Sequence, residues 1–126
     1  MITIIQTILL IDDNRAFTDV FVDYFGTYKE SGFEIIGVVN NGVNAVEMIR
    51  SLQPDIVLLD ISMPNISGYN VLETISSMQL EKKPKVVMLT GMRMHDALRT
   101  SMELGAVAFI EKPFEMDNVI SLLSRV

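Results

Sequence analysis

Several residues whose side chains can do chemistry stand at the ends of apolar runs. Asp12 and Asp13 follow the first run, and Asp60 ends the third. Thr90 ends the fourth run, and Lys112 comes soon after the fifth. Carboxylates a few Å apart either force a proton onto one group or recruit a cation. If the fold brings the three acids together, a single lysine cannot neutralise them, and the cluster is suited to a cation together with a phosphoryl group.

Each of these residues also has an ordinary structural explanation when it is taken alone. The first two acids could cap a helix, although Asn14 could serve as the N-cap by itself. Asp60 could help to form a turn, Thr90 could be a packing residue, and Lys112 could be a solvated loop lysine. Their joint placement at the ends of four different runs is what favours a chemical role.

The composition indicates one globular domain without nucleic-acid chemistry of its own. The chain has 126 residues, of which 49% are apolar and 21% are charged, as in ordinary globular proteins. The net charge of −6 and the lack of a Lys/Arg cluster argue against direct nucleic-acid binding. Cysteine is absent, which excludes disulfides and thiolate sites. The apolar N-terminal stretch is too short to span a bilayer.

Five apolar runs bounded by turn residues predict strands that are buried on both faces. The runs are Thr7–Ile11, Phe33–Val39, Asp55–Ile61, Lys85–Thr90 and Ala106–Ile110. Each is followed by a helical stripe. The stripes are Phe17, Val20, Phe21 and Tyr24; Ala45, Met48, Ile49 and Leu52; Val71, Leu72 and Ile75; a thin stripe of Leu98 and Met102, with Ala97 and Ser101 nearby; and Val119, Leu122, Leu123 and Val126.

The alternation of strands and helices predicts an α/β fold of the (βα)5 type, doubly wound and flavodoxin-like. Right-handed crossovers give a five-stranded parallel sheet that is covered on both faces. The common strand order for this size is 2-1-3-4-5, which places the first and third strands side by side. In this order Asp12 and Asp13 would lie next to Asp60, at the carboxyl edge where such sheets bind ligands.

The donor types at this edge favour a hard cation over other cofactors. Three oxygen donors suit Mg²⁺, which takes one or two carboxylates, keeps several waters and accepts phosphate oxygens. His95 is the only histidine, so a zinc site and a Ser-His-Asp triad lack support. The sequence has no P-loop and no Gly-x-Gly-x-x-Gly motif, which argues against nucleotide binding.

The motifs at the strand ends resemble those of the response regulator receiver domains of two-component and phosphorelay systems. The matching residues are Asp12-Asp13, Asp60 with Met63-Pro64 and Gly68 after it, Thr90-Gly91, and Lys112-Pro113. The resemblance covers essentially the whole chain and implies one receiver domain over residues 1–126. Within the family, Ile11–Arg15, Val86–Thr90 and Lys112–Asn118 are most similar to the receiver of the stage-zero sporulation regulator A group.

The resemblance implies that Asp60 is a phosphoryl acceptor. Its carboxylate would attack the phosphorus of a phosphohistidine on a histidine kinase or phosphotransferase, which gives an aspartyl phosphate. Mg²⁺, or another divalent ion in its place, would be held by Asp12, Asp13 and Asp60 together with the backbone carbonyl of Ser62. The ion would offset charge in a loose phosphoryl-transfer transition state.

Three further residues take roles from the same resemblance. Lys112 would contact a phosphate oxygen, and its peptide bond to Pro113 is expected to be cis. Thr90 would turn its hydroxyl toward the phosphoryl group, beside which Gly91 leaves room. Phe109 stands where the family has an aromatic switch residue, often tyrosine. The missing hydroxyl removes a hydrogen bond from that switch and leaves a change in packing.

By the same resemblance, the chain is a cytoplasmic signalling domain and not an enzyme. Phosphorylation would shift the face made by the fourth helix, fifth strand and fifth helix. That shift would control homodimerisation or an output domain that binds DNA and regulates transcription, with no membrane partner. A stand-alone phosphoryl carrier in a relay is the alternative within this class.

Two other classes use the same edge of such a sheet. A Mg²⁺-dependent phosphohydrolase with Asp60 as nucleophile would need a second acid two residues later, where Ser62 stands. A flavodoxin-type FMN binder would need a phosphate-cradling Ser/Thr-Gly loop after the first strand, where this chain has two acids.

Overall fold

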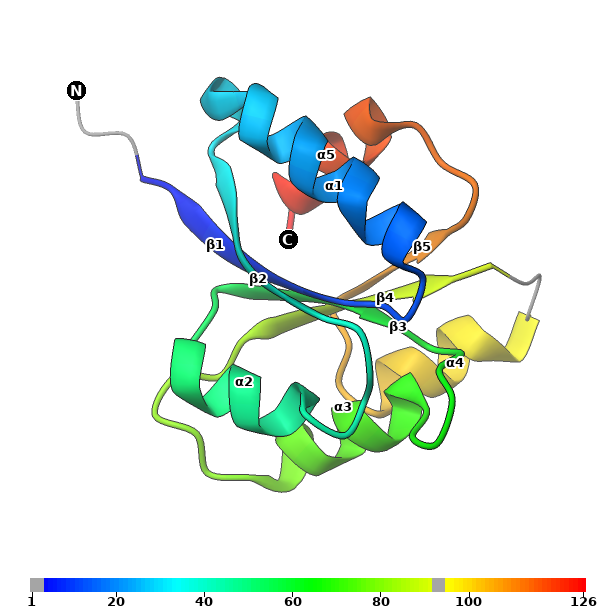
Figure 1. Cartoon of the computed structure of the whole chain (residues 1–126). Helices are drawn as coiled ribbons and strands as arrows, with labels where there is room; N and C mark the ends of the chain where they lie inside the picture. The colour runs from blue at the N-terminus through cyan, green and yellow to red at the C-terminus, as the bar shows by residue number, and fades with distance from the viewer. Residues whose placement is uncertain (1–3, 92–94) are drawn as a thin grey trace.

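Five strands and five α-helices alternate along the chain, which the computed structural model describes over residues 4–91 and 95–126, the side chains of His95 and Asp96 excepted (Figure 1). The strands are β1 Gln6–Ile11, β2 Phe33–Val39, β3 Ile56–Asp60, β4 Lys85–Thr90 and β5 Ala108–Glu111. The helices are α1 Arg15–Thr27, α2 Ala45–Leu52, α3 Gly68–Ser77, α4 His95–Glu103 and α5 Met116–Leu123, with a 3-10 turn at Lys29–Ser31. None of these helices has the length and apolar character that crossing a membrane requires.

The sheet is parallel and has the order β2-β1-β3-β4-β5, which confirms the predicted fold. Ile11 is in register with Leu59 on β3, so the residues after these two positions leave the sheet together. At the same edge, Thr90 on β4 is in register with Glu111 on β5. The register therefore aligns the carboxyl ends of four neighbouring strands along one edge.

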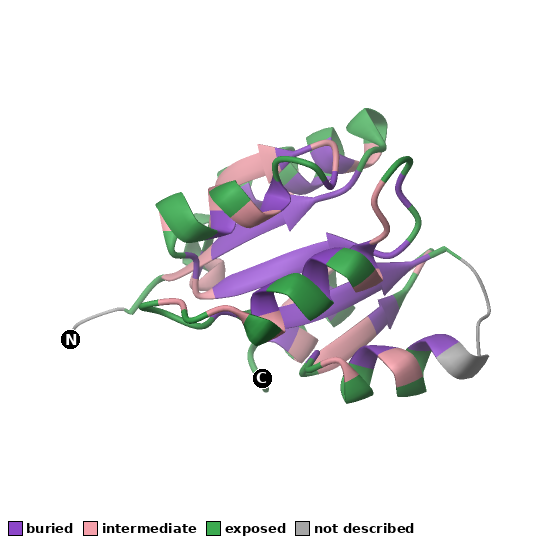
Figure 2. Ribbon diagram, turned by 90° about the horizontal axis from the view of Figure 1, so that it is seen from below, coloured by how far each residue is buried: buried purple, intermediate pink, exposed green. Residues whose placement is uncertain are grey.

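The strands are apolar on both faces because helices cover both faces. Successive strand residues point to opposite sides: Ile8 and Leu10 pack in the cluster beneath α1 and α5, and Leu9 and Ile11 pack in the cluster beneath α2, α3 and α4. Figure 1 shows these two layers above and below the sheet, and Figure 2 shows that the strands are mostly buried. Burial on both sides holds the strand ends in fixed positions.

The buried face of α1 differs from the predicted stripe. Val20 is 59% exposed, whereas Phe21 and Phe25 are buried. The aromatic residues at i, i+4 and i+8 stack along the helix, with ring centroids 5.0 Å apart for Phe17 and Phe21 and 6.0 Å apart for Phe21 and Phe25. The large rings turn this column toward the sheet, because burying them removes more apolar surface from water than burying Val20 would.

The apolar stripe predicted for α4 is wrong as well. Leu98 and Met102 are 51% and 45% exposed, whereas Ala97 and Ser101 are fully buried. Small side chains on the inner face let the helix lie close to the sheet, which leaves the two larger residues facing solvent. The outer face of α4 therefore carries apolar side chains that the domain does not bury.

The last strand and the last helix are shorter than predicted. β5 begins at Ala108 and not at Ala106, because the N–H of Ala106 donates to the carbonyl of Ser101 and closes the end of α4. α5 ends at Leu123, so Val126 lies beyond its apolar face. These differences leave the carboxyl edge of the sheet unchanged.

Candidate functional site

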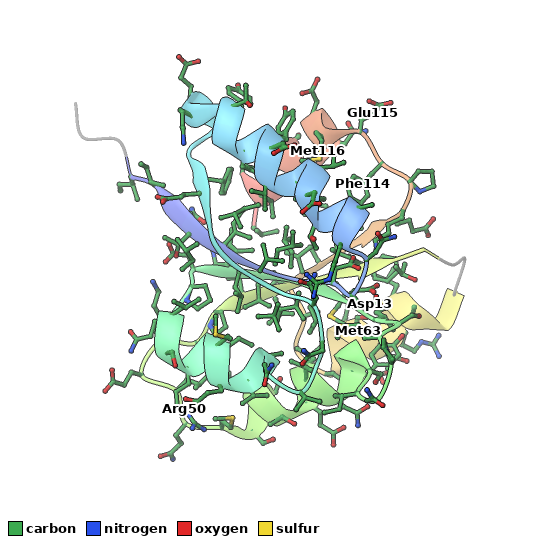
Figure 3. The ribbon with its side chains drawn as sticks, viewed as in Figure 1. Asp13, Arg50, Met63, Phe114, Glu115 and Met116 are labelled. Carbon is green, nitrogen blue, oxygen red and sulfur yellow. The ribbon has the colours of Figure 1, made fainter. Side chains whose placement is uncertain are left out.

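The structure brings Asp12, Asp13 and Asp60 together at the carboxyl edge of the sheet. One carboxylate oxygen from each lies within 4.8 Å of the others. Asp60 is the last residue of β3, and Asp12 follows β1; their exposed fractions are 5% and 0%. Asp13, labelled in Figure 3, is exposed and follows Asp12 in the turn between β1 and α1. Three carboxylate oxygens this close together are the kind of ligand set that a hard divalent ion prefers.

Asp60 is the most strongly perturbed of the three acids. Burial, followed by the neighbouring charge of Asp12, raises the pKa of its carboxyl group to about 7. Lys112 acts in the opposite direction, and Asp13 adds repulsion and a hydrogen bond that favour the protonated form. A nearby positive charge would favour the ionised form of Asp60, because ionisation places a negative charge next to other carboxyl groups.

Asp12 is held by groups from three elements. Its Oδ1 accepts a hydrogen bond from the N–H of Asn14 at 2.9 Å, and its Oδ2 accepts one from Lys112 Nζ at 2.6 Å. Asn40 Nδ2 donates to the Asp12 carbonyl at 2.9 Å. Asn14 in turn caps α1, accepting from the N–H of Phe17 at 3.1 Å. Capping is thus the role of Asn14, and Asp12 is oriented into the cluster.

Lys112 brings a positive charge to this edge. Its Nζ lies 2.6 Å from Asp12 Oδ2, 3.8 Å from Asp60 Oδ1 and 4.0 Å from the centroid of the Phe17 ring. The Lys112–Pro113 peptide bond is cis, as expected. The contact with Phe17 is one that the sequence analysis missed, because Phe17 was assigned only to the core. Its position four residues after Asp13, in the first turn of α1, is the signal that could have shown it.

Gly68 holds the loop after Asp60 against the end of β3. A Cβ atom at this position would lie 2.2 Å from the carbonyl oxygen of Asp60, so only glycine fits without a backbone shift. The N–H of Gly68 donates to the carbonyl of Ile61 at 2.8 Å, and Ser67 caps α3. The loop between Asp60 and Gly68 contains Asn65, whose φ of 71° turns the chain. This packing fixes the backbone that carries Asp60.

The remaining predicted site residues, Thr90, Ser62 and Phe109, differ in how far they are buried. Thr90 is buried at the end of β4, and its carbonyl accepts from the N–H of Lys112 at 2.6 Å. Ser62 has an exposed side chain in the loop two residues after Asp60. Phe109 on β5 is half-buried and packs against the core beneath α2, α3 and α4. Thr90 and Ser62 thus lie at the carboxyl edge of the sheet, whereas Phe109 lies within β5, two residues before its last residue.

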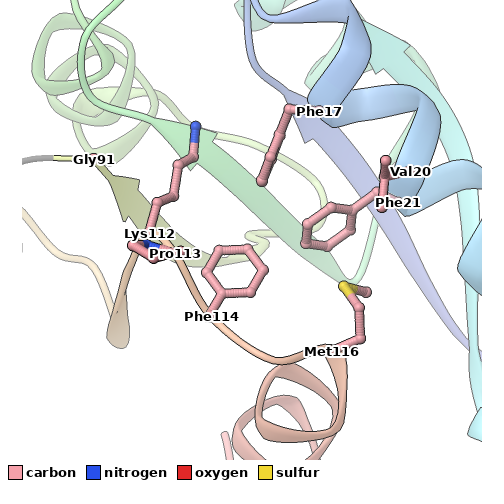
Figure 4. A pocket seen from close by; sticks show the side chains of 8 residues that line it. All are labelled: Phe17, Val20, Phe21, Gly91, Lys112, Pro113, Phe114 and Met116. Atoms are coloured by element: carbon pink, nitrogen blue, oxygen red, sulfur yellow. The ribbon is translucent and has the colours of Figure 1, made fainter.

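An open apolar groove adjoins the acidic cluster on the side of α1. It has a volume of 490 Å³ and is lined by residues of α1, of the end of β4 and of the segment that follows β5. Figure 4 shows the Lys112 side chain, the rings of Phe17 and Phe114, and the smaller Val20 and Gly91 around it. An apolar groove beside a charged site offers a surface that a partner protein could contact while its reactive group reaches the acids.

Comparison with known proteins assigns the chain to a family. The family model of the response regulator receiver domain matches residues 8–124, so the chain belongs to this family. Among solved structures, the response regulator domain of CheB from Thermotoga maritima is 25% identical, with a TM-score of 0.79 and coverage of 96% of this chain and 92% of that one.

Two further structures share the fold at lower identity. A DNA-binding response regulator of the LuxR family from Staphylococcus aureus is 23% identical, with a TM-score of 0.84 and coverage of 96% and 98% of the two chains. The chemotaxis protein CheY4 from Vibrio cholerae is 20% identical, with a TM-score of 0.82 and coverage of 97% and 98%. The chain is therefore a receiver domain in sequence and in architecture.

Proposed function

We propose that this receiver domain accepts a phosphoryl group on Asp60 from a phosphohistidine of a histidine kinase or phosphotransferase. The observation that carries the proposal is the placement of Asp60: it is buried, one of its carboxylate oxygens lies within 4.8 Å of oxygens of Asp12 and Asp13, and Lys112 Nζ lies 3.8 Å away. Such a carboxylate can be a nucleophile only where positive charge is at hand. The lysine supplies part of this charge.

In the proposed reaction an oxygen of Asp60 forms a bond to phosphorus while the bond from phosphorus to the histidine nitrogen breaks. The imidazole keeps the electron pair of that bond and leaves as the phosphoryl group is transferred. Lys112, whose Nζ lies 3.8 Å from Asp60 Oδ1, would contact a phosphoryl oxygen, and Thr90, at the end of the neighbouring strand, would turn its hydroxyl toward the phosphoryl group. Positioning and charge stabilisation account for most of the catalysis in such transfers.

A divalent cation, with Mg²⁺ as the natural choice, fits the acidic cluster. The residues that would hold it are Asp12, Asp13 and Asp60, with the backbone carbonyl of Ser62. When bound, it supplies the positive charge that three carboxylates and one lysine lack. The pKa of Asp60, raised to about 7, is consistent with an acid that ionises fully only in the presence of such a charge.

The proposed output surface is the face made by α4, β5 and α5. Leu98, Met102 and Val107 are exposed there, and Phe109 lies half-buried beside them. We expect phosphorylation to shift this face and to pair it with a second copy or with an output domain that binds DNA. Because Phe109 lacks a hydroxyl, the shift would be one of packing.

The finer assignment is to transcription regulators of the sporulation type, and it rests on three short stretches. These are Ile11–Arg15, Val86–Thr90 and Lys112–Asn118. The first stretch contains Asp12 and Asp13, and the last begins with Lys112, so the similarity includes residues of the candidate site. A domain of this kind would act in the cytoplasm as the phosphorylated half of a regulator.

Incubation with acetyl phosphate and Mg²⁺, followed by intact-mass measurement, tests the proposed function. We expect the chain to gain the mass of one phosphoryl group and to lose this gain when Mg²⁺ is chelated. The Asp60→Asn variant should gain nothing. The matched control is Asp55→Asn, an acid at the opposite end of β3, which should behave like the parent. An unchanged adduct in Asp60→Asn would contradict the proposal.

A further inference from the structure

The ammonium group of Lys112 rests on the face of an aromatic ring as well as on the acids. The distance from Nζ to the centroid of the Phe17 ring is 4.0 Å, which is within the range of a cation–π contact. The same nitrogen contacts Asp12 Oδ2 at 2.6 Å and lies 3.8 Å from Asp60 Oδ1. The ammonium group thus contacts both the Phe17 ring and Asp12.

The Phe17 ring is itself held in place by two other rings. Its centroid lies 5.0 Å from that of Phe21, which is buried, and 5.8 Å from that of Phe114 in an edge-to-face arrangement. Phe21 and Phe114 also meet edge to face, at 5.8 Å. Three rings in mutual contact restrict one another's rotation, so Phe17 presents a fixed surface to Lys112.

Without that ring, the Lys112 side chain could adopt other conformations that extend into the groove. The 490 Å³ groove begins at Lys112 and continues past Val20 and Phe114 (Figure 4). Gly91 offers no obstruction, since a Cβ atom there would have no neighbour within 4 Å. A lysine side chain has several rotatable bonds and loses rotamer entropy when it is held in one position. The ring therefore adds to the ion pair with Asp12 a second contact that holds the ammonium group at the acidic edge.

We propose that Phe17 is a positioning residue for phosphoryl transfer to Asp60, acting through a cation–π contact that holds the ammonium group of Lys112 beside the acceptor carboxylate. This inference rests on the proposed function and adds a residue to it. The role requires the negative face of an aromatic ring, so an aliphatic side chain of similar size cannot replace it.

A fluorinated series at Phe17 tests this role directly. Mono-, di- and trifluorophenylalanine withdraw electron density from the ring face with little change in size, so they weaken a cation–π contact in steps. With acetyl phosphate and Mg²⁺, we expect the rate of Asp60 phosphorylation to fall in the same steps. The total loss should be about two- to fivefold, the factor that matches a cation–π contact at a partly exposed site.

The same residues at Phe25 are the matched control. Phe25 is a buried aromatic on α1 that packs against Phe21 and Phe33, away from the groove lining. Fluorination there should leave the rate unchanged. The Phe17→Leu variant should lose as much rate as the trifluoro ring, and Phe17→Tyr should restore the parent rate. Equal rates across the Phe17 series would overturn the proposal.

A second readout needs neither metal nor phosphoryl donor. In the NMR spectrum of the metal-free chain, the Lys112 ε-methylene protons should be shifted upfield by the Phe17 ring current. This shift should be lost in Phe17→Leu and kept in Phe17→Tyr; identical Lys112 signals in all three would contradict the contact. If the parent gains no phosphoryl group, the proposed function fails and this inference with it. A phosphorylated parent with a flat fluorinated series overturns the positioning role alone.

Discussion

Replacing Asp60 by asparagine should make the metal-free domain more stable at neutral and alkaline pH. Burial, then the charge of Asp12, raises the pKa of the Asp60 carboxyl to about 7. The folded chain therefore holds a proton that the unfolded chain releases near pH 4. The stability due to this proton is fully present below the pKa of the unfolded chain and is lost as pH rises through about 7. Asparagine has nearly the same shape and cannot ionise.

The expected size follows from the pKa shift and from the openness of the cluster. A shift of this size corresponds to about 4 kcal/mol for a fully enclosed group. Because Asp13, on the outer side of the cluster, is exposed to solvent, we expect screening to reduce the effect to roughly 2 kcal/mol. The free energy of unfolding of Asp60→Asn should thus exceed that of the parent by roughly this amount at pH 8, and the difference should shrink toward zero near pH 4.

Urea unfolding followed by circular dichroism, in buffers that contain a chelator, measures this difference. Parent and variant are compared at each pH, so that the titration of all other groups cancels. The reasoning would be refuted by a difference that stays constant from pH 4 to pH 8, or by a variant that is less stable than the parent at pH 8. Added Mg²⁺ should then stabilise the parent far more than Asp60→Asn, since binding to the folded state alone raises stability.

Three further predictions concern the loop, the output face and the far end of the sheet. Gly68→Ala should cost about 2 kcal/mol of stability and weaken Mg²⁺ binding, both measured by calorimetry, because its Cβ would lie 2.2 Å from the Asp60 carbonyl oxygen. Leu98→Glu should abolish phosphorylation-dependent self-association in sedimentation experiments and leave the phosphorylation rate unchanged, since Leu98 is exposed on α4. Asp55→Ala should lower the free energy of unfolding by about 1 to 2 kcal/mol in urea, because Asp55 accepts from the N–H of Thr7 at 2.7 Å, while phosphorylation proceeds as in the parent.

The sequence was sufficient to predict the sheet because its strands have no solvent face. A strand such as β3, with all five residues buried, appears in the sequence as a continuous apolar run. The faces of α1 and α4 were predicted less well. Hydrophobicity favours Val20 and Leu98 as core residues, but the distance between helix and sheet decides which side chains fit. On α4 that distance selects Ala97 and Ser101, which a ranking by hydrophobicity places below Leu98 and Met102.

The candidate site was predictable as far as strand order determines it. Once the first and third strands are neighbours, Asp12 and Asp60 must leave the sheet side by side. Contacts made by side chains from other elements were beyond this reasoning. The hydrogen bond from Asn40 to the Asp12 carbonyl and the contact of Phe17 with Lys112 depend on loop paths and rotamers that no spacing rule supplies.

The most direct test of the central claim locates the phosphoryl group on the chain. After phosphorylation with acetyl phosphate and Mg²⁺, borohydride reduction converts an aspartyl phosphate into homoserine, and peptide mass spectrometry finds the converted residue. The account predicts conversion at Asp60, with Asp12, Asp13 and Asp55 left intact. Homoserine at another aspartate, or a stable phosphoryl group on a hydroxyl side chain with Asp60 unchanged, would contradict it.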